Sequence, residues 1–123
     1  MNMSNRSRSV LVVDDDPVIR DMMVDILSFE DYPIVVARNG REALDKLRGE
    51  ENYLVFLDLM MPVMDGRAFC EQFHADPLLR NRHVVVIMSA MDRMEEAASL
   101  HVHATLPKPF SVDDVMDVMQ PFM

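Results

Sequence analysis

Short apolar runs alternate with polar stretches along the whole chain. Four of these runs are rich in Val, Ile, Leu and Phe and show little polar alternation, while a fifth is weaker. They are Val10–Val13, Ile34–Ala37, Leu54–Leu57, Val84–Met88 and, more weakly, Val102–Leu106. Short uninterrupted apolar runs are typical of strands that are covered on both faces, as in a parallel sheet. The pattern therefore predicts five buried strands.

The segments between the apolar runs have helical spacing. Val18–Leu27 places its apolar residues on one stripe, and Asp16 and Pro17 before it suit an N-cap and a first helical position. The same spacing predicts four more helices. They centre on Ala43–Leu47, on Phe69–Phe73 after an Asp65-Gly66 turn, on Met91–Ala98, and on Val112–Met119 with Ser111 as its N-cap. Strand and helix thus alternate five times, which predicts a doubly wound (βα)5 α/β sandwich with right-handed crossovers.

The composition is that of one reduced, folded domain. The chain has 123 residues, half of them hydrophobic, and we expect a single domain over residues 1–123 with a core at about 9–120. One cysteine cannot form an internal disulfide. Lys and Arg number 12 against 21 Asp and Glu, which gives a net charge of −9. A domain this acidic repels phosphate backbones, so we expect no direct binding to nucleic acid.

The same pattern gives no indication of membrane insertion or export. The apolar runs are too short to span a bilayer. Met1–Ser9 is polar, and Val10–Val13 alone is too short for the apolar core of a signal peptide. We therefore expect a cytoplasmic protein that does not associate with membranes.

Residues that carry chemistry follow the ends of four predicted strands. They are the triplet Asp14-Asp15-Asp16 after the first run, Asp58 after the third, Ser89 after the fourth and Lys108 after the fifth. In open α/β sheets the ligand site lies beyond the carboxyl ends of the strands, so these side chains are expected to converge. The sequence therefore predicts a site with several carboxylates, one hydroxyl and one lysine.

The predicted site suits phosphoryl transfer to an aspartate. Crowded carboxylates repel one another and need a cation to stay ionised. An all-oxygen set of ligands without His or Cys favours a hard ion, of which Mg²⁺ is the most plausible. A carboxylate can then act as the nucleophile and form an acyl phosphate. A lysine and a hydroxyl nearby would stabilise the negative charge on the phosphoryl oxygens.

Four segments of the chain match one known family in order and at the right strand ends. They are Val12–Pro17, Leu57–Gly66, Met88–Ala90 and Lys108–Phe110. With these motifs the chain resembles the receiver domain (CheY-like) of bacterial two-component response regulators, from about Ser9 to Gln120. The resemblance implies a flavodoxin-like fold with a five-stranded parallel sheet in the order 2-1-3-4-5.

The resemblance also implies a role for each site residue. Asp58 matches the phosphoacceptor, Ser89 the hydroxyl that contacts the phosphoryl group, and Lys108 the lysine that pairs with the aspartate or its phosphate. The implied ligands of Mg²⁺ are Asp15, Asp58, the main-chain carbonyl of Met60 and, through water, Asp14. The family often has a cis peptide bond after the lysine, so we expect one at Lys108–Pro109.

A signalling switch is the function that the resemblance implies. The phosphoryl donor would be a sensor histidine kinase or a phosphotransfer protein. The signal would pass to a downstream effector protein or to a C-terminal output domain missing from this sequence. A homodimer through the helix 4–strand 5–helix 5 face is possible in this family. Such a domain catalyses only its own phosphoryl transfer and dephosphorylation, so we expect no metabolic enzyme.

The sequence leaves two other functions open. The first is a receiver fold that only docks a partner, without phosphorylation. Thr105 supports it, because the family commonly has Tyr or Phe there and a threonine cannot fill the same space on activation. The second is a phosphatase like the haloacid dehalogenases, with Asp14 as its nucleophile. Proteins of that family need a larger core, and this function would give Asp58 no role.

Two departures from the family pattern lead to expectations about local structure. His101-Val102 replaces the Gly-Ala that usually ends the fourth helix. Since a left-handed cap without glycine is strained, we expect this helix to end differently or to leave a carbonyl to solvent. Met60 and Met91 border the path of the water that hydrolyses the acyl phosphate in this family, so we expect them to shield it.

The remaining unusual residues have simpler interpretations. Most of the thirteen methionines are expected to pack in the core. Met60, Met61, Met64, Met91 and Met94 could instead form a partner surface. Cys70 is expected to be an inert core residue. The four histidines have no carboxylate or cysteine at metal-ligand spacing, so we expect surface or loop positions for His74, His83, His101 and His103.

Overall fold

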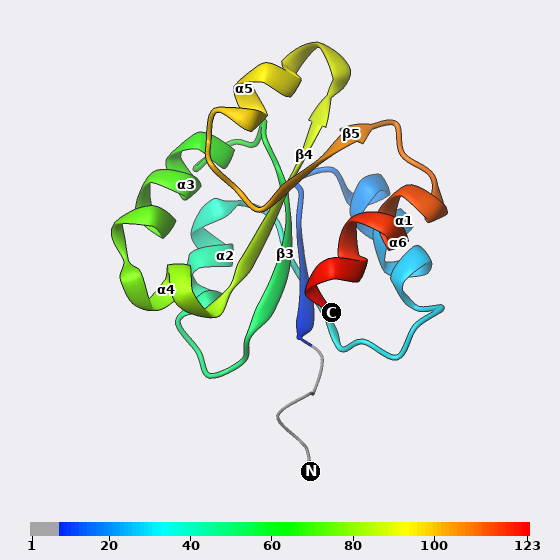
Figure 1. Cartoon of the computed structure of the whole chain (residues 1–123), viewed down its shortest axis with the longest axis horizontal. Helices are drawn as coiled ribbons and strands as arrows, with labels where there is room; N and C mark the ends of the chain where they lie inside the picture. The colour runs from blue at the N-terminus through cyan, green and yellow to red at the C-terminus, as the bar shows by residue number, and fades with distance from the viewer. Residues whose placement is uncertain (1–7) are drawn as a thin grey trace.

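The computed structural model of the chain describes residues 8–123 as three layers, with one sheet between two groups of helices (Figure 1). The expectation about export signals rests partly on Met1–Ser7, which lies outside the described residues.

The central layer is a parallel sheet of five strands. The strands are β1 (Ser9–Val13), β2 (Ile34–Ala37), β3 (Tyr53–Asp58), β4 (Val84–Ala90) and β5 (Ala104–Lys108). Their order is β2-β1-β3-β4-β5, as the family resemblance implies, and every neighbouring pair is parallel. β1 and β3 are buried along their whole length, which explains why their sequences show no polar alternation.

Helices cover both faces of the sheet. One group packs with the core that contains Phe69, Phe73 and Leu47, and it consists of α2 (Gly40–Leu47), α3 (Gly66–Ala75), α4 (Pro77–Arg82) and α5 (Met94–Ala98). The other group packs with the core that contains Phe56 and Met23, and it consists of α1 (Pro17–Leu27) and α6 (Val112–Met119). Short 3-10 turns precede α5 and follow α6, at Met91–Arg93 and Gln120–Phe122.

Side chains cap three helix starts, two of them at the predicted residues Asp16 and Ser111, and the third at Asp65, which was predicted only as part of a turn. The Asp16 carboxylate accepts a hydrogen bond from the N–H of Val18, and Pro17 is the first residue of α1. Asp65 caps α3 in the same way. Ser111 and Asp114 form a reciprocal capping box at the start of α6. The two predicted caps are confirmed, because capping depends on local residues alone.

Departures from the sequence prediction include one unpredicted helix and the shifted starts of two other elements. The apolar pattern does not predict α4, because only Leu79 of its six residues is buried and no apolar stripe marks it. Its start is nevertheless encoded by Asp76, which accepts from the N–H of Leu78, and by Pro77. The predicted helix Met91–Ala98 begins as a 3-10 turn, and β5 starts two residues later than its apolar run.

The end of α5 also differs from the expectation. His101 has a positive φ of 56°, so a non-glycine residue does occupy the left-handed region there. Its N–H lies 3.4 Å from the carbonyl oxygen of Ala98, and the N–H of Leu100 donates to Ala97. The chain must turn sharply at this point because the N–H of His103 donates to the carbonyl of Val85 in β4. Pairing with the sheet therefore imposes the left-handed residue that sequence reasoning rejected.

We expect His101→Gly to stabilise the protein by about 0.5 to 1 kcal/mol. A left-handed non-glycine residue costs about 1 to 2 kcal/mol, and the extra chain entropy of glycine offsets about half of that gain. The measurement is urea unfolding followed by circular dichroism, with His101→Ala as the matched control. Alanine keeps the strain, so a similar gain in the alanine variant would show that the backbone conformation is not the cause.

His83 lies in the connection between α4 and β4, in line with the expected surface or loop position, but it is buried. His83 is 1% exposed, its Nδ1 accepts from the N–H of Tyr53, and its Nε2 lies 2.9 Å from the carbonyl oxygen of Leu47. Burial is the main influence that lowers the pKa of His83. This ring therefore joins α2 to β3 as a buried polar link.

Cys70 is buried in the core as expected, and burial raises its pKa to about 12. A thiol with such a pKa carries almost no thiolate near neutral pH and is inert.

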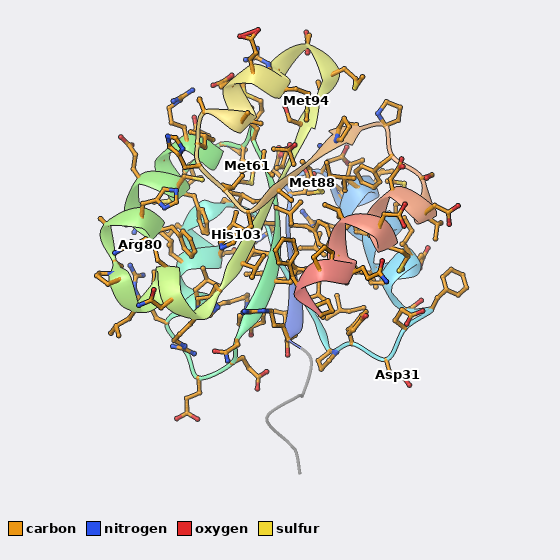
Figure 2. All side chains as sticks on the ribbon, in the orientation of Figure 1. Asp31, Met61, Arg80, Met88, Met94 and His103 are labelled. Carbon is orange, nitrogen blue, oxygen red and sulfur yellow. The ribbon has the colours of Figure 1, made fainter. Side chains whose placement is uncertain are left out.

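The methionines divide between core and surface. Met23, Met61, Met64, Met88 and Met119 are buried, which confirms core packing for these residues. Met60 and Met91 are exposed on segments that follow β3 and β4. Figure 2 labels Met61, Met88 and Met94 among the side chains on the ribbon. The five methionines considered as a partner surface are therefore not a single exposed group.

Candidate functional site

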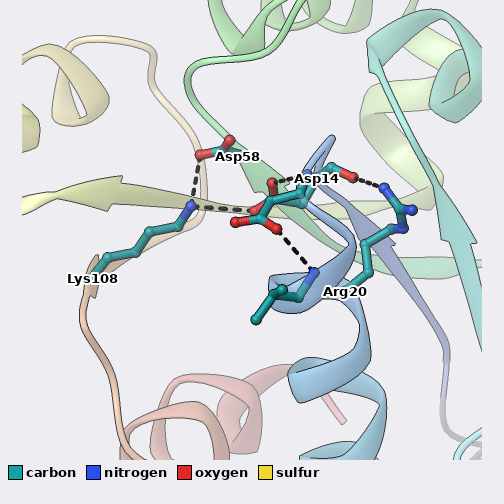
Figure 3. Close-up of polar contacts among 6 residues, drawn as sticks. Asp14, Arg20, Asp58 and Lys108 are labelled. Carbon is teal, nitrogen blue, oxygen red and sulfur yellow. Dashed lines mark hydrogen bonds and ion pairs between the residues drawn. The ribbon is translucent and has the colours of Figure 1, made fainter.

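The predicted site residues lie at the carboxyl-terminal edge of the sheet. Asp58 is the last residue of β3, Lys108 is the last residue of β5, and Asp14 directly follows β1. The parallel register places these strand ends side by side, with Asp58 opposite Met88 of β4 and Lys108 opposite Ala90. Figure 3 shows the Asp58, Asp14 and Lys108 side chains pointing toward one another. The expected convergence of the strand ends is therefore present.

Three carboxylates form the acidic part of the site. Asp14, Asp15 and Asp58 each offer an oxygen, and these oxygens lie within 4.8 Å of one another. Asp14 is fully buried and Asp58 is 8% exposed, whereas Asp15 is open to solvent. Oxygen ligands alone, with one side open, are the set that a hard divalent ion such as Mg²⁺ prefers while it keeps several waters. The residues present therefore fit this ion.

Lys108 supplies the positive charge of the site. Its Nζ lies 3.1 Å from Oδ1 of Asp58 and 3.2 Å from Oδ2 of Asp14 (Figure 3). The side chain reaches from β5 past β4 to both carboxylates, and the peptide bond after it is cis, as expected. Burial, the largest single influence, favours the neutral amine, but Asp58 and Asp14 together outweigh it and raise the pKa of Lys108. The lysine is thus held charged.

The Asp58 carboxyl group has a raised pKa. Burial is the main cause that raises its pKa to about 6, the charge on Asp14 adds to the rise, and Lys108 opposes it. Lys108 therefore does not fully offset the combined effect of burial and of the neighbouring carboxylates. A bound cation would favour the ionised form of Asp58, which is the form able to act as a nucleophile.

Asp16 and Arg20 have supporting positions beside the acidic cluster. Asp16 turns its carboxylate to the start of α1, while its N–H donates to Oδ1 of Asp14 at 3.0 Å. Arg20 of α1 donates from Nη1 to the main-chain carbonyl of Asp14 at 2.7 Å (Figure 3). Arg20 was missed in the sequence, because its partner is a backbone atom and no motif marks such a contact.

Ser89 and Met60 lie at the rim of the site. Ser89 is buried in β4, and its hydroxyl donates to the carbonyl of Ala90 at 3.2 Å. Within residues 8–123, this hydroxyl has no hydrogen bond to the three carboxylates or to Lys108. Met60 follows β3 by two residues, and its side chain is 53% exposed.

The loop after Asp58 is folded tightly back on the strand end. The N–H of Leu59 donates to Met88, and the N–H of Gly66 donates to the carbonyl of Leu59 at 2.9 Å. A Cβ atom on Gly66 would lie 2.9 Å from Cα of Leu59, so the close approach requires glycine. Between them, Val63 has a positive φ of 69°. The loop therefore fixes the backbone that follows Asp58 in the chain.

The helices of residues 8–123 are all too short or too polar to cross a membrane.

Comparison with known proteins identifies relatives across almost the whole chain. The family model described as response regulator receiver domain matches residues 10–120. A response regulator named MprA from Mycolicibacterium vanbaalenii is 36% identical over 116 residues, which cover 90% of this chain and 48% of that protein. The chain thus spans about half the length of the curated relatives that it matches.

Solved structures show the same fold. The chemotaxis response regulator CheY4 of Vibrio cholerae superimposes with a TM-score of 0.82 at 24% identity, covering 96% of this chain and 100% of that one. The receiver domain of the sensor histidine kinase PA1611 from Pseudomonas aeruginosa gives a TM-score of 0.83 at 20% identity, with 95% and 98% covered. In that structure a magnesium ion is coordinated in the active-site cleft.

Proposed function

Because the chain belongs to the response regulator receiver domain family, a family of two-component signalling, we propose that Asp58 is its phosphoryl acceptor and that phosphorylation changes partner binding. The observation that carries the proposal is the placement of Asp58. Among the clustered Asp14, Asp15 and Asp58, it alone is the last residue of a strand, and its buried carboxylate contacts Lys108 at 3.1 Å.

The chain's own residues suggest how the transfer proceeds. An oxygen of the ionised Asp58 carboxylate attacks the phosphorus of a phosphohistidine, so an O–P bond forms while the P–N bond breaks. Lys108 then exchanges its contact with Asp58 for one with a phosphoryl oxygen and stabilises the negative charge there. The hydroxyl of Ser89 rotates away from Ala90 to donate to the same group. These contacts exist only with the phosphoryl group, which is how phosphorylation would alter β4 and β5.

Magnesium is the cofactor we propose for this site. Asp15, Asp58 and the main-chain carbonyl of Met60 would bind it directly, and Asp14 through water. When bound, it neutralises charge on the carboxylates and on the incoming phosphoryl group. The cluster of three carboxylate oxygens within 4.8 Å and the magnesium ion in the PA1611 receiver domain support this assignment.

The partners we propose follow from the family. A sensor histidine kinase or a phosphotransfer protein would supply the phosphoryl group in the cytoplasm. A downstream effector or an output domain would read the signal, and a homodimer could form through the face made by α5, β5 and α6. Residues 1–123 would act as one receiver domain. Beyond its own phosphorylation and dephosphorylation it would catalyse no reaction, and it would bind neither nucleic acid nor membranes directly.

A docking module without phosphorylation is the second candidate. Thr105 favours it, because this half-buried residue of β5 pairs with Ile87 where the family commonly has an aromatic side chain. If phosphorylation does switch this chain, the segment after Ser89 must repack in a way that does not use an aromatic side chain at position 105. The phosphatase alternative would use Asp14 as nucleophile, but this side chain is fully buried and already accepts from Asp16 and Lys108.

The intact mass of the chain after incubation with Mg²⁺ and a small acyl phosphate separates the first two functions. The switch predicts a gain of one phosphoryl group that disappears when Mg²⁺ is removed with a chelator. No gain, in a sample that binds Mg²⁺, would favour the docking module.

We expect replacement of Met60 and Met91 by polar residues to shorten the lifetime of the phosphoryl group. Both side chains are exposed beside the site, on the segments after Asp58 and Ser89, and their apolar surface would hinder the attacking water. A change of about threefold to tenfold in the rate of dephosphorylation is expected for Met60→Gln together with Met91→Gln. Exposed Leu78 on the distant α4 offers the control, as Leu78→Gln. An unchanged lifetime would argue against shielding.

A further inference from the structure

Arg20 contacts the acidic cluster through the backbone and not through a carboxylate. Its Nη1 donates to the main-chain carbonyl of Asp14 at 2.7 Å, and the guanidinium lies on the opposite side of Asp14 from Lys108 (Figure 3). No ion pair joins Arg20 to a carboxylate of the described part of the chain. The contact is therefore directed at one peptide group.

That peptide group joins two of the three clustered carboxylates. The carbonyl of Asp14 lies in the plane of the peptide bond between Asp14 and Asp15. A hydrogen bond to this oxygen therefore fixes the orientation of the peptide plane that joins the two residues. The other polar groups of Asp14 are also bonded. Its N–H donates to Ala37, Oδ1 accepts from the N–H of Asp16, and Oδ2 accepts from Lys108. Arg20 completes the set for a fully buried residue.

The position of Arg20 in the sequence also indicates a specific role. It lies in the first turns of α1, where the helix dipole disfavours a positive charge. Between residues 9 and 37 it is the only basic residue, among seven acidic ones. Side chains of a helix lean toward its N-terminus, so a long side chain at this place reaches back to the end of β1. The location thus suits a contact with the Asp14–Asp15 peptide.

We propose that Arg20 is a positioning residue that holds the Asp14–Asp15 peptide so that both carboxylates face Asp58. The proposal rests on the proposed function, since it assigns Arg20 a part in preparing the acidic cluster for its cation and for phosphoryl transfer. Without the guanidinium, the carbonyl of Asp14 loses its partner and the peptide can rotate. The cation would then bind more weakly, while Asp58 and Lys108 stay in place.

The test is a titration of the chain with Mg²⁺, followed by the amide NMR signals of residues 14–16 and 58–60. In Arg20→Met the half-saturating Mg²⁺ concentration is expected to rise about tenfold, as for other residues that orient metal ligands. Arg20→Lys, which can still donate one hydrogen bond, is expected to recover part of the difference. Arg48→Met is the matched control, because Arg48 is exposed and its ion pair is with Asp45 within the same helix region.

A second readout separates positioning from a general loss of structure. Phosphoryl uptake by Arg20→Met should be slow at limiting Mg²⁺ and return toward the native rate at saturating Mg²⁺, in a variant that circular dichroism shows to be folded. A native half-saturation in Arg20→Met overturns the proposal. If that variant does not fold, Arg20→Gln takes its place, since its side chain is too short for the carbonyl, and the same criterion applies. If the native chain itself takes up no phosphoryl group, the proposed function fails, whereas the Mg²⁺ titration still tests Arg20.

Discussion

An Asp58→Asn chain is expected to take up no phosphoryl group and to be more stable than the native chain without Mg²⁺. The uptake is lost because the amide oxygen is a poor nucleophile and no other carboxylate occupies the same place. Asp15 is solvent-exposed, and Asp14 is fully buried with both oxygens bonded. The loss is therefore expected to be complete.

The gain in stability has an electrostatic cause. The Asp58→Asn substitution would remove one of three negative charges whose oxygens lie within 4.8 Å, two of them on buried residues. One lysine compensates them only in part, so relief of this repulsion is expected to contribute about 1 to 2 kcal/mol. Urea unfolding in the presence of a chelator measures it. Asp45→Asn, at an exposed helix position, is the control. A less stable Asp58→Asn chain would show that Lys108 already balances the cluster.

Replacement of Lys108 by methionine is expected to slow phosphoryl uptake by about 10²-fold at saturating Mg²⁺. The ammonium group lies 3.1 Å from Oδ1 of Asp58, beside the carboxylate that would carry the phosphoryl group. Removal of one donor to a developing negative charge costs about 10²- to 10³-fold in enzymes. Methionine keeps the length and apolar stem of the side chain, so packing at the end of β5 changes little.

The only other lysine provides the control for this variant. Lys46 lies in α2, away from the carboxyl ends of the strands, and Lys46→Met is expected to be phosphorylated at the native rate. Stopped samples analysed by intact mass give both rates. A Lys108→Met chain that takes up the phosphoryl group at the native rate would mean that the Lys108–Asp58 contact has no part in the transfer.

The position of the acidic cluster and the lysine could be predicted from the sequence because the fold itself brings them together. Asp58 and Lys108 are the last residues of parallel strands and Asp14 directly follows one, and the carboxyl ends of parallel strands meet at one edge. Local rules likewise sufficed for Asp16 and Ser111, whose caps depend on neighbouring residues.

Features that depend on distant partners were missed. The polar residues directly before His83 give no sign that its ring is buried and bonded to the N–H of Tyr53 and the carbonyl of Leu47. The left-handed conformation of His101 is imposed by the pairing of His103 with Val85. Arg20 acts on a backbone oxygen, which leaves no trace in a motif.

Whether Asp58 is the sole phosphoryl acceptor is tested most directly by chemical trapping in the native chain. After incubation with Mg²⁺ and a small acyl phosphate, reduction with borohydride converts a phosphorylated aspartate to homoserine, which peptide mass spectrometry can locate. Homoserine at position 58 and at no other aspartate is the predicted result. Homoserine at position 14, as a phosphatase of the haloacid dehalogenase type requires, or unmodified peptides from a chain that binds Mg²⁺, would contradict it.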